Sequence, residues 1–160
     1  MRVEKDTMGS VEVPKNAYYG AQTQRASENF VVSDDKIHLE IIYAITIIKR
    51  SAAIVNHSLN KISKIEKNAI VQAADEILRK KFDDQFIIDI YQTGSGTSTN
   101  MNVNEVIANR ANELLGYALG TNGPIHPNDH VNMGQSSNDV IPSSIHIAVK
   151  KLVLNKLIPA

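Results

Sequence analysis

The sequence has 160 residues, of which 42% are hydrophobic and 21% are charged, a composition that supports one folded domain and argues against disorder. Its 17 Lys and Arg residues balance 17 Asp and Glu residues, so no charge excess points to nucleic acid or a membrane as a partner, and a small ligand is favoured. The absence of cysteine excludes disulfides and cysteine-ligated metals, while an N-terminus without an apolar segment and apolar runs too short for a membrane favour a cytoplasmic protein.

The first thirty residues are rich in turn signals. Gly9, Pro14 and Gly20 separate short β-branched stretches, which predicts an irregular arm or a small hairpin. From about residue 35 to residue 57 the spacing changes, and apolar residues recur at intervals of three and four, as in an amphipathic helix. These positions are Ile37, Ile41, Ile42, Ile45, Ile48, Ala52 and Val55.

Two further helices follow along the chain. Ser63 and Glu66 have the spacing of a capping box and predict the start of one helix, and apolar residues continue on one face to about Leu78. The next helix is predicted from about Ser98, with Gly116 as its stop.

The last third begins with a long loop. Residues 120–139 are dense in Gly, Pro, Asn and Ser, and loops of this length are often functional. A fourth helix is predicted from Asn138 or Asp139, with Pro142 in its first turn. Apolar residues lie nearly all round this helix, which predicts a buried helix whose neighbours come from outside these 160 residues, so that the chain is either a fragment or completed by oligomerisation.

Two stretches, "TGSGTSTN" at 93–100 and "GQSSND" at 134–139, place glycines and hydroxyl residues just before a predicted helix. A helix start carries unpaired N–H groups and a partial positive charge, so a pair of such starts could hold a dicarboxylate. Gly94 and Gly96 would let the backbone approach a ligand. The candidate donors are Ser95, Thr97, Ser136, Ser137 and Asn138. Plain helix capping remains an equally good interpretation of both stretches.

Other kinds of site find less support. The first stretch lacks the ending of a Walker A loop and is not the glycine pattern of a Rossmann turn, and no G-x-S-x-G elbow is present. His126 and His130 lie in "HPNDH", where a metal site is conceivable, but no second ligand cluster supports it. A turn that presents polar groups to an anion is the preferred interpretation.

Three segments in order resemble the fumarase/aspartase superfamily, and within it the class II fumarases. They are "EKDTMGSVEVPKNAYYGAQTQRASENF" at 4–30, "GSGTSTNMNVNEVIANRA" at 94–111 and "HPNDHVNMGQSSNDVIPSSIHIA" at 126–148. The resemblance implies a mostly α fold, with an N-terminal helical domain at 1–135 that carries an irregular or short-hairpin arm. It also implies that residues 136–160 begin a long helix of a central bundle.

The resemblance further implies reversible hydration of fumarate to L-malate, as in the tricarboxylic acid cycle, with no metal or organic cofactor. A base removes a proton beside a carboxylate, and the doubly charged aci-carboxylate that forms needs surrounding donors. By the family pattern, the residues that bind substrate carboxylates are Ser95, Gly96, Thr97, Ser136, Ser137 and Asn138. A secondary anion site would comprise His126, Pro127, Asn128 and Asp129.

The family's catalytic base lies on a later mobile loop, and its Thr-His pair also lies beyond residue 160. We therefore expect no catalytic residue in this chain, and the chain alone should be inactive. Family members form homotetramers in which three subunits build each site. Two alternatives stay open: an aspartate ammonia-lyase, which tends to have Ala and Thr where Ser95 and Ser137 stand here, and a non-catalytic helical assembly domain.

Overall fold

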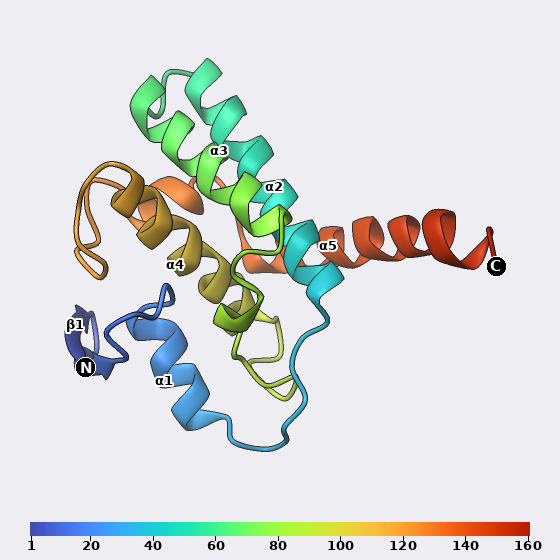
Figure 1. Cartoon of the computed structure of the whole chain (residues 1–160), viewed down its shortest axis with the longest axis horizontal. Coiled ribbons are helices and arrows are strands. Elements are labelled where there is room, and N and C mark those ends of the chain that lie inside the picture. Colours follow the sequence, from blue (N-terminus) through green and yellow to red (C-terminus); the bar gives the residue numbers. More distant parts are fainter.

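The computed structural model describes residues 1–160 and is mostly α-helical (Figure 1). Its longer elements are β1 (Arg2–Asp6), β2 (Gly9–Val13), α1 (Ala21–Asn29), α2 (Leu39–Ser58), α3 (Lys64–Leu78), α4 (Thr97–Leu114) and α5 (Ser137–Leu152). One 3-10 turn, η1 (Asp83–Gln85), and two single π-helical turns, η2 (Pro127–Val131) and η3 (Val153–Leu157), complete the chain. The predicted fold class is confirmed.

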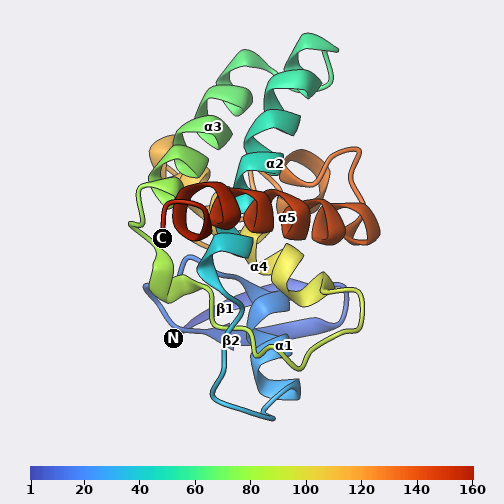
Figure 2. The same ribbon diagram turned by 90° about the vertical axis from the view of Figure 1, so that its right-hand side faces the viewer.

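The N-terminal arm is an antiparallel hairpin, as one of the two sequence-based interpretations had it. Strands β1 and β2 pair from Arg2 opposite Val13 to Asp6 opposite Gly9. Gly9 closes the turn at a φ of +116°, a conformation that favours glycine. The hairpin lies beside α1, below the upright pair of helices α2 and α3 (Figure 2).

Helix α1 was not predicted, because its start is stabilised from elsewhere in the chain. The buried carboxylate of Glu105 in α4 accepts hydrogen bonds of 2.9, 2.9 and 3.1 Å from three backbone N–H groups, those of Gly20, Gln22 and Thr23. Glu4 in β1 accepts a fourth, of 3.0 Å, from the first residue of α1. The N–H groups that a helix start leaves unpaired are thus satisfied by two carboxylates, which also complement the helix dipole.

Helices α2 and α3 form an antiparallel pair. Helix α2 begins at Leu39 rather than near residue 35, because the His38 ring accepts a hydrogen bond from the Glu40 N–H and caps the helix. Ile42 and Ile45 are buried as predicted, whereas Val55 is 54% exposed and does not belong to the core. No helix of the structure has the length and apolarity needed to span a membrane.

The capping box at the start of α3 is confirmed. Ser63 Oγ accepts a hydrogen bond from the Glu66 N–H at 3.2 Å, and the Glu66 carboxylate accepts one from the Ser63 N–H at 2.6 Å. A Ser63→Ala variant should therefore lose about 1 kcal/mol of unfolding free energy in urea titrations. A Ser58→Ala variant, which changes an exposed serine at the end of α2, is the control and should lose less than half of that amount.

Helix α4 is the centre of the molecule. Every residue from 98 to 109 is buried, including the asparagines. The amide of Asn112 pairs with both the N–H and the carbonyl of Ile125 at 2.8 Å, and Asn109 Nδ2 donates to the carbonyl of Tyr18 at 2.9 Å. The side-chain amides of this helix thus give hydrogen-bond partners to backbone groups of the neighbouring segments, which would otherwise be buried without partners.

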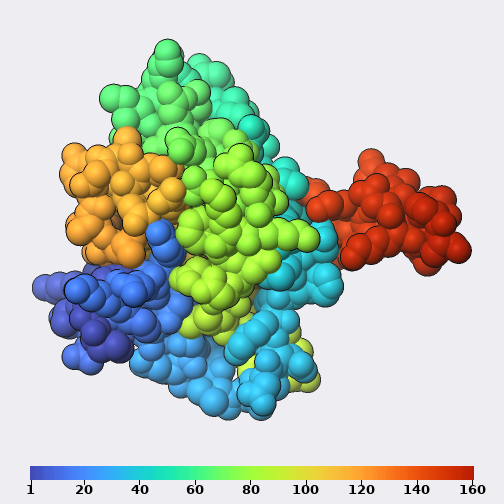
Figure 3. All heavy atoms as spheres, in the orientation of Figure 1, coloured from blue at the N-terminus to red at the C-terminus, as the bar shows by residue number.

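Helix α5 leaves the body of the molecule as an arm, with the C-terminus at its tip (Figures 1 and 3). It starts at Ser137, so Pro142 is its sixth residue and lies within the helix rather than in its first turn, which corrects the prediction. Apart from its contacts with α2 and, at its start, with α4, the side of α5 is unpartnered, and Ile145 and Val149 are 46% and 52% exposed.

Candidate functional site

The starts of α4 and α5 adjoin each other. Asn100 Nδ2 in the first turn of α4 donates a 3.0 Å hydrogen bond to Ser137 Oγ at the first position of α5. Gly96, the residue before α4, has a φ of +68°, and a Cβ built on it would lie 3.0 Å from Ile141 Cγ1. A side chain at Gly96 would therefore force the two helix starts apart.

The hydroxyl groups of Ser95 and Thr97 do not cap α4. Ser95 Oγ and Thr97 Oγ1 lie 2.8 Å from each other, and both side chains are exposed. The second and third residues of α4 instead donate their N–H groups to Thr93 Oγ1 at 3.2 Å and Gln92 Oε1 at 2.9 Å. Capping by the first stretch was one of the two interpretations, and Thr93 bears it out, whereas sequence reasoning missed Gln92, which lies just before that stretch.

The three candidate residues at the start of α5 have different surroundings. Ser136 is the cap, since its Oγ accepts a 3.3 Å hydrogen bond from the Asn138 N–H. Ser137 Oγ accepts from Asn100, and no atom of the chain accepts the Ser137 hydroxyl hydrogen. The Asn138 side chain is exposed and makes no hydrogen bond within the chain. The capping interpretation therefore accounts for Ser136 but not for Ser137 or Asn138.

The junction of the two helices offers several neutral donors on one side of the molecule. The backbone N–H groups of Thr97 and Ser137, each at the first position of its helix, make no backbone hydrogen bond. A hollow of about 260 Å³ lies beside the junction and is lined by Gly94, Gly96, Ile141 and four other isoleucines among its ten residues, whereas none of the candidate donors lines it. Helix starts with free N–H groups and nearby hydroxyls attract and orient carboxylates, and neutral donors do so without exchanging a proton.

A buried lysine lies behind this junction. Lys49 in α2 is 0% exposed, and its Nζ donates a 2.6 Å hydrogen bond to Asn132 Oδ1. No carboxylate pairs with it, and burial lowers the pKa of Lys49 to about 7. Asn132 Oδ1 also accepts a 3.3 Å hydrogen bond from Asn100, which links the lysine to the helix starts.

The turn predicted as a secondary anion site is closed upon itself. His126 Nδ1 accepts hydrogen bonds of 3.2 Å from the N–H groups of both Asn128 and Asp129, and the His126 N–H donates to His130 Nδ1 at 3.0 Å. Two ring nitrogens that a metal could have used are therefore engaged within the turn. No group of three or more potential metal ligands gathers in the structure.

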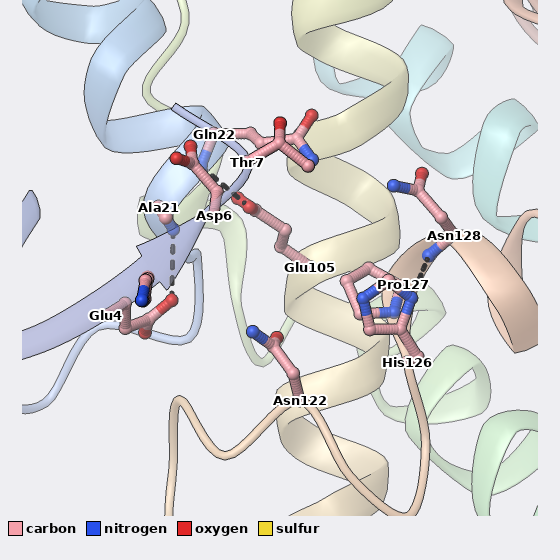
Figure 4. A pocket seen from close by; sticks show the side chains of 11 residues that line it. Glu4, Asp6, Thr7, Ala21, Gln22, Glu105, Asn122, His126, Pro127 and Asn128 are labelled. Carbon is pink, nitrogen blue, oxygen red and sulfur yellow. Dashed lines mark hydrogen bonds between the residues drawn. The ribbon is translucent and has the colours of Figure 1, made fainter. Parts of the chain in front are cut away.

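This turn lines a pocket of about 460 Å³ that carboxylates border on the opposite side (Figure 4). Glu4 and Asp6 from β1 and Glu105 from α4 face it. Arg2 and Arg25 form salt bridges of 2.6 and 2.9 Å with Glu4 and Asp6, so part of the negative charge is balanced. An anion near His126 would meet this mixed surface rather than a purely basic one.

Comparison with known proteins agrees with the motifs. A family profile described as "Lyase" matches residues 9–160. The class II fumarate hydratase of Campylobacter jejuni is 54% identical over 159 residues, which cover 99% of this chain and 34% of that protein. The class II fumarate hydratase of Neisseria meningitidis is 50% identical with the same coverage. The chain thus spans about a third of the length of the curated relatives it matches.

Solved structures agree with the fold as well. The class II fumarase of Schistosoma mansoni superposes with a TM-score of 0.96 at 44% identity, over 99% of this chain and 33% of that one. A fumarate lyase:delta crystallin from Brucella melitensis gives 0.90 at 45% identity, over 94% of this chain and 34% of its own. The family profile extends over nearly the whole sequence, and the chain therefore belongs to the lyase family.

Proposed function

We propose that this chain forms the N-terminal third of a class II fumarate hydratase, which hydrates fumarate reversibly to L-malate. The junction of α4 and α5 carries the proposal, because it presents free N–H groups and hydroxyls that cap neither helix, in a chain that is 54% identical to such an enzyme. Thr97, Ser137 and Asn138 would hold one carboxylate of the substrate, with Ser95 and Gly96 beside them and Ser136 capping α5.

The donors suit the charge that this reaction develops. Removal of the proton from malate turns a neighbouring carboxylate into an aci-carboxylate with two negative charges, and donors fixed before the reaction stabilise it without reorganising. The N–H groups of Thr97 and Ser137 are fixed by their helices, and no group among the proposed carboxylate ligands has an ordinary pKa near neutrality. The base and the rest of the site would come from the remaining two thirds of the protein.

The same proposal extends to the organisation of the protein. Residues 1–135 would form the N-terminal helical domain, and 136–160 would begin the central bundle of a cytoplasmic homotetramer. The exposed Ile145 and Val149 on the arm fit helix packing of that kind. His126, Pro127, Asn128 and Asp129 stay a candidate for a secondary anion site.

Activity assays of the full-length protein that carries this chain would decide between the readings. Turnover of fumarate and L-malate is expected, and no turnover of L-aspartate, because Ser95 and Ser137 stand where aspartate ammonia-lyases tend to have Ala and Thr. Turnover of L-aspartate alone would establish the ammonia-lyase. A full-length protein without activity on either substrate would leave the assembly domain as the remaining reading.

A Ser137→Ala variant of the full-length protein should lose about 1–3 kcal/mol of transition-state stabilisation, because a charged carboxylate then lacks one buried donor. The measurement is kcat/KM for fumarate. Ser143→Ala, a change on the same helix at a serine whose hydroxyl donates to Asp139, is the control and should leave kcat/KM unchanged. Equal kinetics of the two variants would show that Ser137 has only a structural role.

A further inference from the structure

Lys49 lies outside the proposed carboxylate site, yet a chain of hydrogen bonds joins it to Ser137 in that site. We propose that Lys49 is a positioning residue for substrate binding: through Asn132 and Asn100 it fixes the direction in which Ser137 donates its hydroxyl hydrogen. This inference rests on the proposed function, because it assigns Lys49 to the same carboxylate site.

The first link sets the orientation of Asn132. The Lys49 ammonium has only donors, so the Asn132 side chain must turn its oxygen, and not its NH₂ group, toward it. The 2.6 Å distance from Lys49 Nζ to Asn132 Oδ1 agrees with this orientation. The Asn132 Nδ2 then points the other way and donates to the carbonyl of Gln135 at 3.3 Å.

The second link sets the orientation of Asn100. Because Asn132 presents an oxygen, Asn100 turns its NH₂ group toward it, at 3.3 Å, and the same nitrogen lies 3.0 Å from Ser137 Oγ. Asn100 is 1% exposed, and its Oδ1 is left without a partner within the chain. An unpaired buried oxygen is costly, so Asn100 would not choose this orientation without the two acceptors on its nitrogen side.

The third link leaves the Ser137 hydroxyl hydrogen available to the substrate. Ser137 Oγ accepts the Asn100 hydrogen, so the Ser137 hydroxyl hydrogen is free to point to a ligand. Without Lys49, only the long 3.3 Å hydrogen bond to the Gln135 carbonyl holds the Asn132 amide, so the Asn132 and Asn100 amides can both reverse, which would place the Asn100 oxygen against Ser137. The Ser137 hydroxyl would then donate inward to Asn100, and the substrate carboxylate would lose that donor.

A purely structural role explains Lys49 poorly. A buried ammonium without a carboxylate partner destabilises a fold, and an apolar side chain of the same length fills the space at lower cost. Lys49 is 0% exposed and in no salt bridge, in contrast to its neighbour Arg50, which pairs with Asp75 at 2.7 Å. The position of the charge is therefore better explained by the orientation that it imposes.

A double-mutant cycle in the full-length protein tests the inference. KM for fumarate is measured just below neutral pH, where the amine is protonated, for Lys49→Met, Ser137→Ala and the double variant. Each single change should raise KM about tenfold, and the double variant should also show about tenfold rather than a hundredfold, because both changes remove the same donated hydrogen. Arg50→Met is the matched control on the same helix and should leave KM unchanged.

Multiplying effects, or a Lys49→Met enzyme with the KM of the wild type, would overturn the inference. If Lys49→Met does not fold, Asn132→Leu removes the middle link and must give the same rise and the same non-additivity with Ser137→Ala. If the wild type hydrates fumarate but the Lys49 and Ser137 changes raise KM independently of each other, only this inference fails and the proposed function stands. A wild type that does not turn over fumarate defeats the proposed function, and the inference falls with it.

Discussion

A Glu105→Ala variant of the chain is expected to lose about 3–5 kcal/mol of unfolding free energy, the largest loss among the changes considered. The carboxylate accepts hydrogen bonds from three backbone N–H groups at the start of α1, and its removal leaves these donors without a partner. Each orphaned buried donor costs about 1–3 kcal/mol, and water from the neighbouring pocket of about 460 Å³ would recover part of the total.

Urea unfolding followed by circular dichroism measures this loss. Glu113→Ala is the control on the same helix, because its more exposed carboxylate pairs with Arg110 and accepts one 2.7 Å hydrogen bond from the Tyr18 hydroxyl, and it should contribute no more than about 1–2 kcal/mol. Glu105→Gln should lie between the two, since an amide keeps one acceptor oxygen. A loss below about 1 kcal/mol in Glu105→Ala would mean that the hairpin and Glu4 hold α1 without help from α4.

Lys49→Met is expected to change how stability depends on pH. Burial lowers the pKa of Lys49 from 10.5 in the unfolded chain to about 7 in the folded one. Between these two values the unfolded chain binds a proton that the folded chain has released, so the stability contributed by this site rises with pH. Below about pH 7 both states are protonated, and the wild type bears the full cost of the buried charge.

The Met variant should therefore be more stable than the wild type by about 2–4 kcal/mol near pH 6, and the difference should shrink steadily toward pH 10. Unfolding free energies of both proteins across this range give the difference, in which the contributions of all other groups cancel. Arg50→Met should differ from the wild type by an amount that stays constant over the same range. A constant difference for Lys49→Met as well would contradict the lowered pKa.

Local sequence signals located most of the helices. The capping box of Ser63 and Glu66 and the stop at Gly116 involve residues within a few positions of each other, so the chain near them contains the whole signal. The hydroxyl-rich segments before α4 and α5 were likewise visible. The two helix starts are joined by the Asn100–Ser137 hydrogen bond. Its partners are 37 residues apart, and no periodic pattern in the sequence reveals such a contact.

Two further features that sequence reasoning missed depend on distant partners. Helix α1 has only alanines and Thr23 among its buried residues, and its cap Glu105 is 85 residues away from Gly20. Lys49 reads as a polar interruption of an apolar helix, and its partner Asn132 is 83 residues further along the chain. Neither composition nor spacing encodes such pairs, because the register between the helices is set by tertiary packing.

The asparagines of α4 also have a consequence for the order of assembly. Asn109 and Asn112 bind the segments around Tyr18 and Ile125 to defined positions along the axis of α4. The spacing of these two side chains is set only once the helix has formed, so the loops should reach their native positions after α4 has folded and packed. Helix α4 would thus serve as the template on which these loops order late in folding.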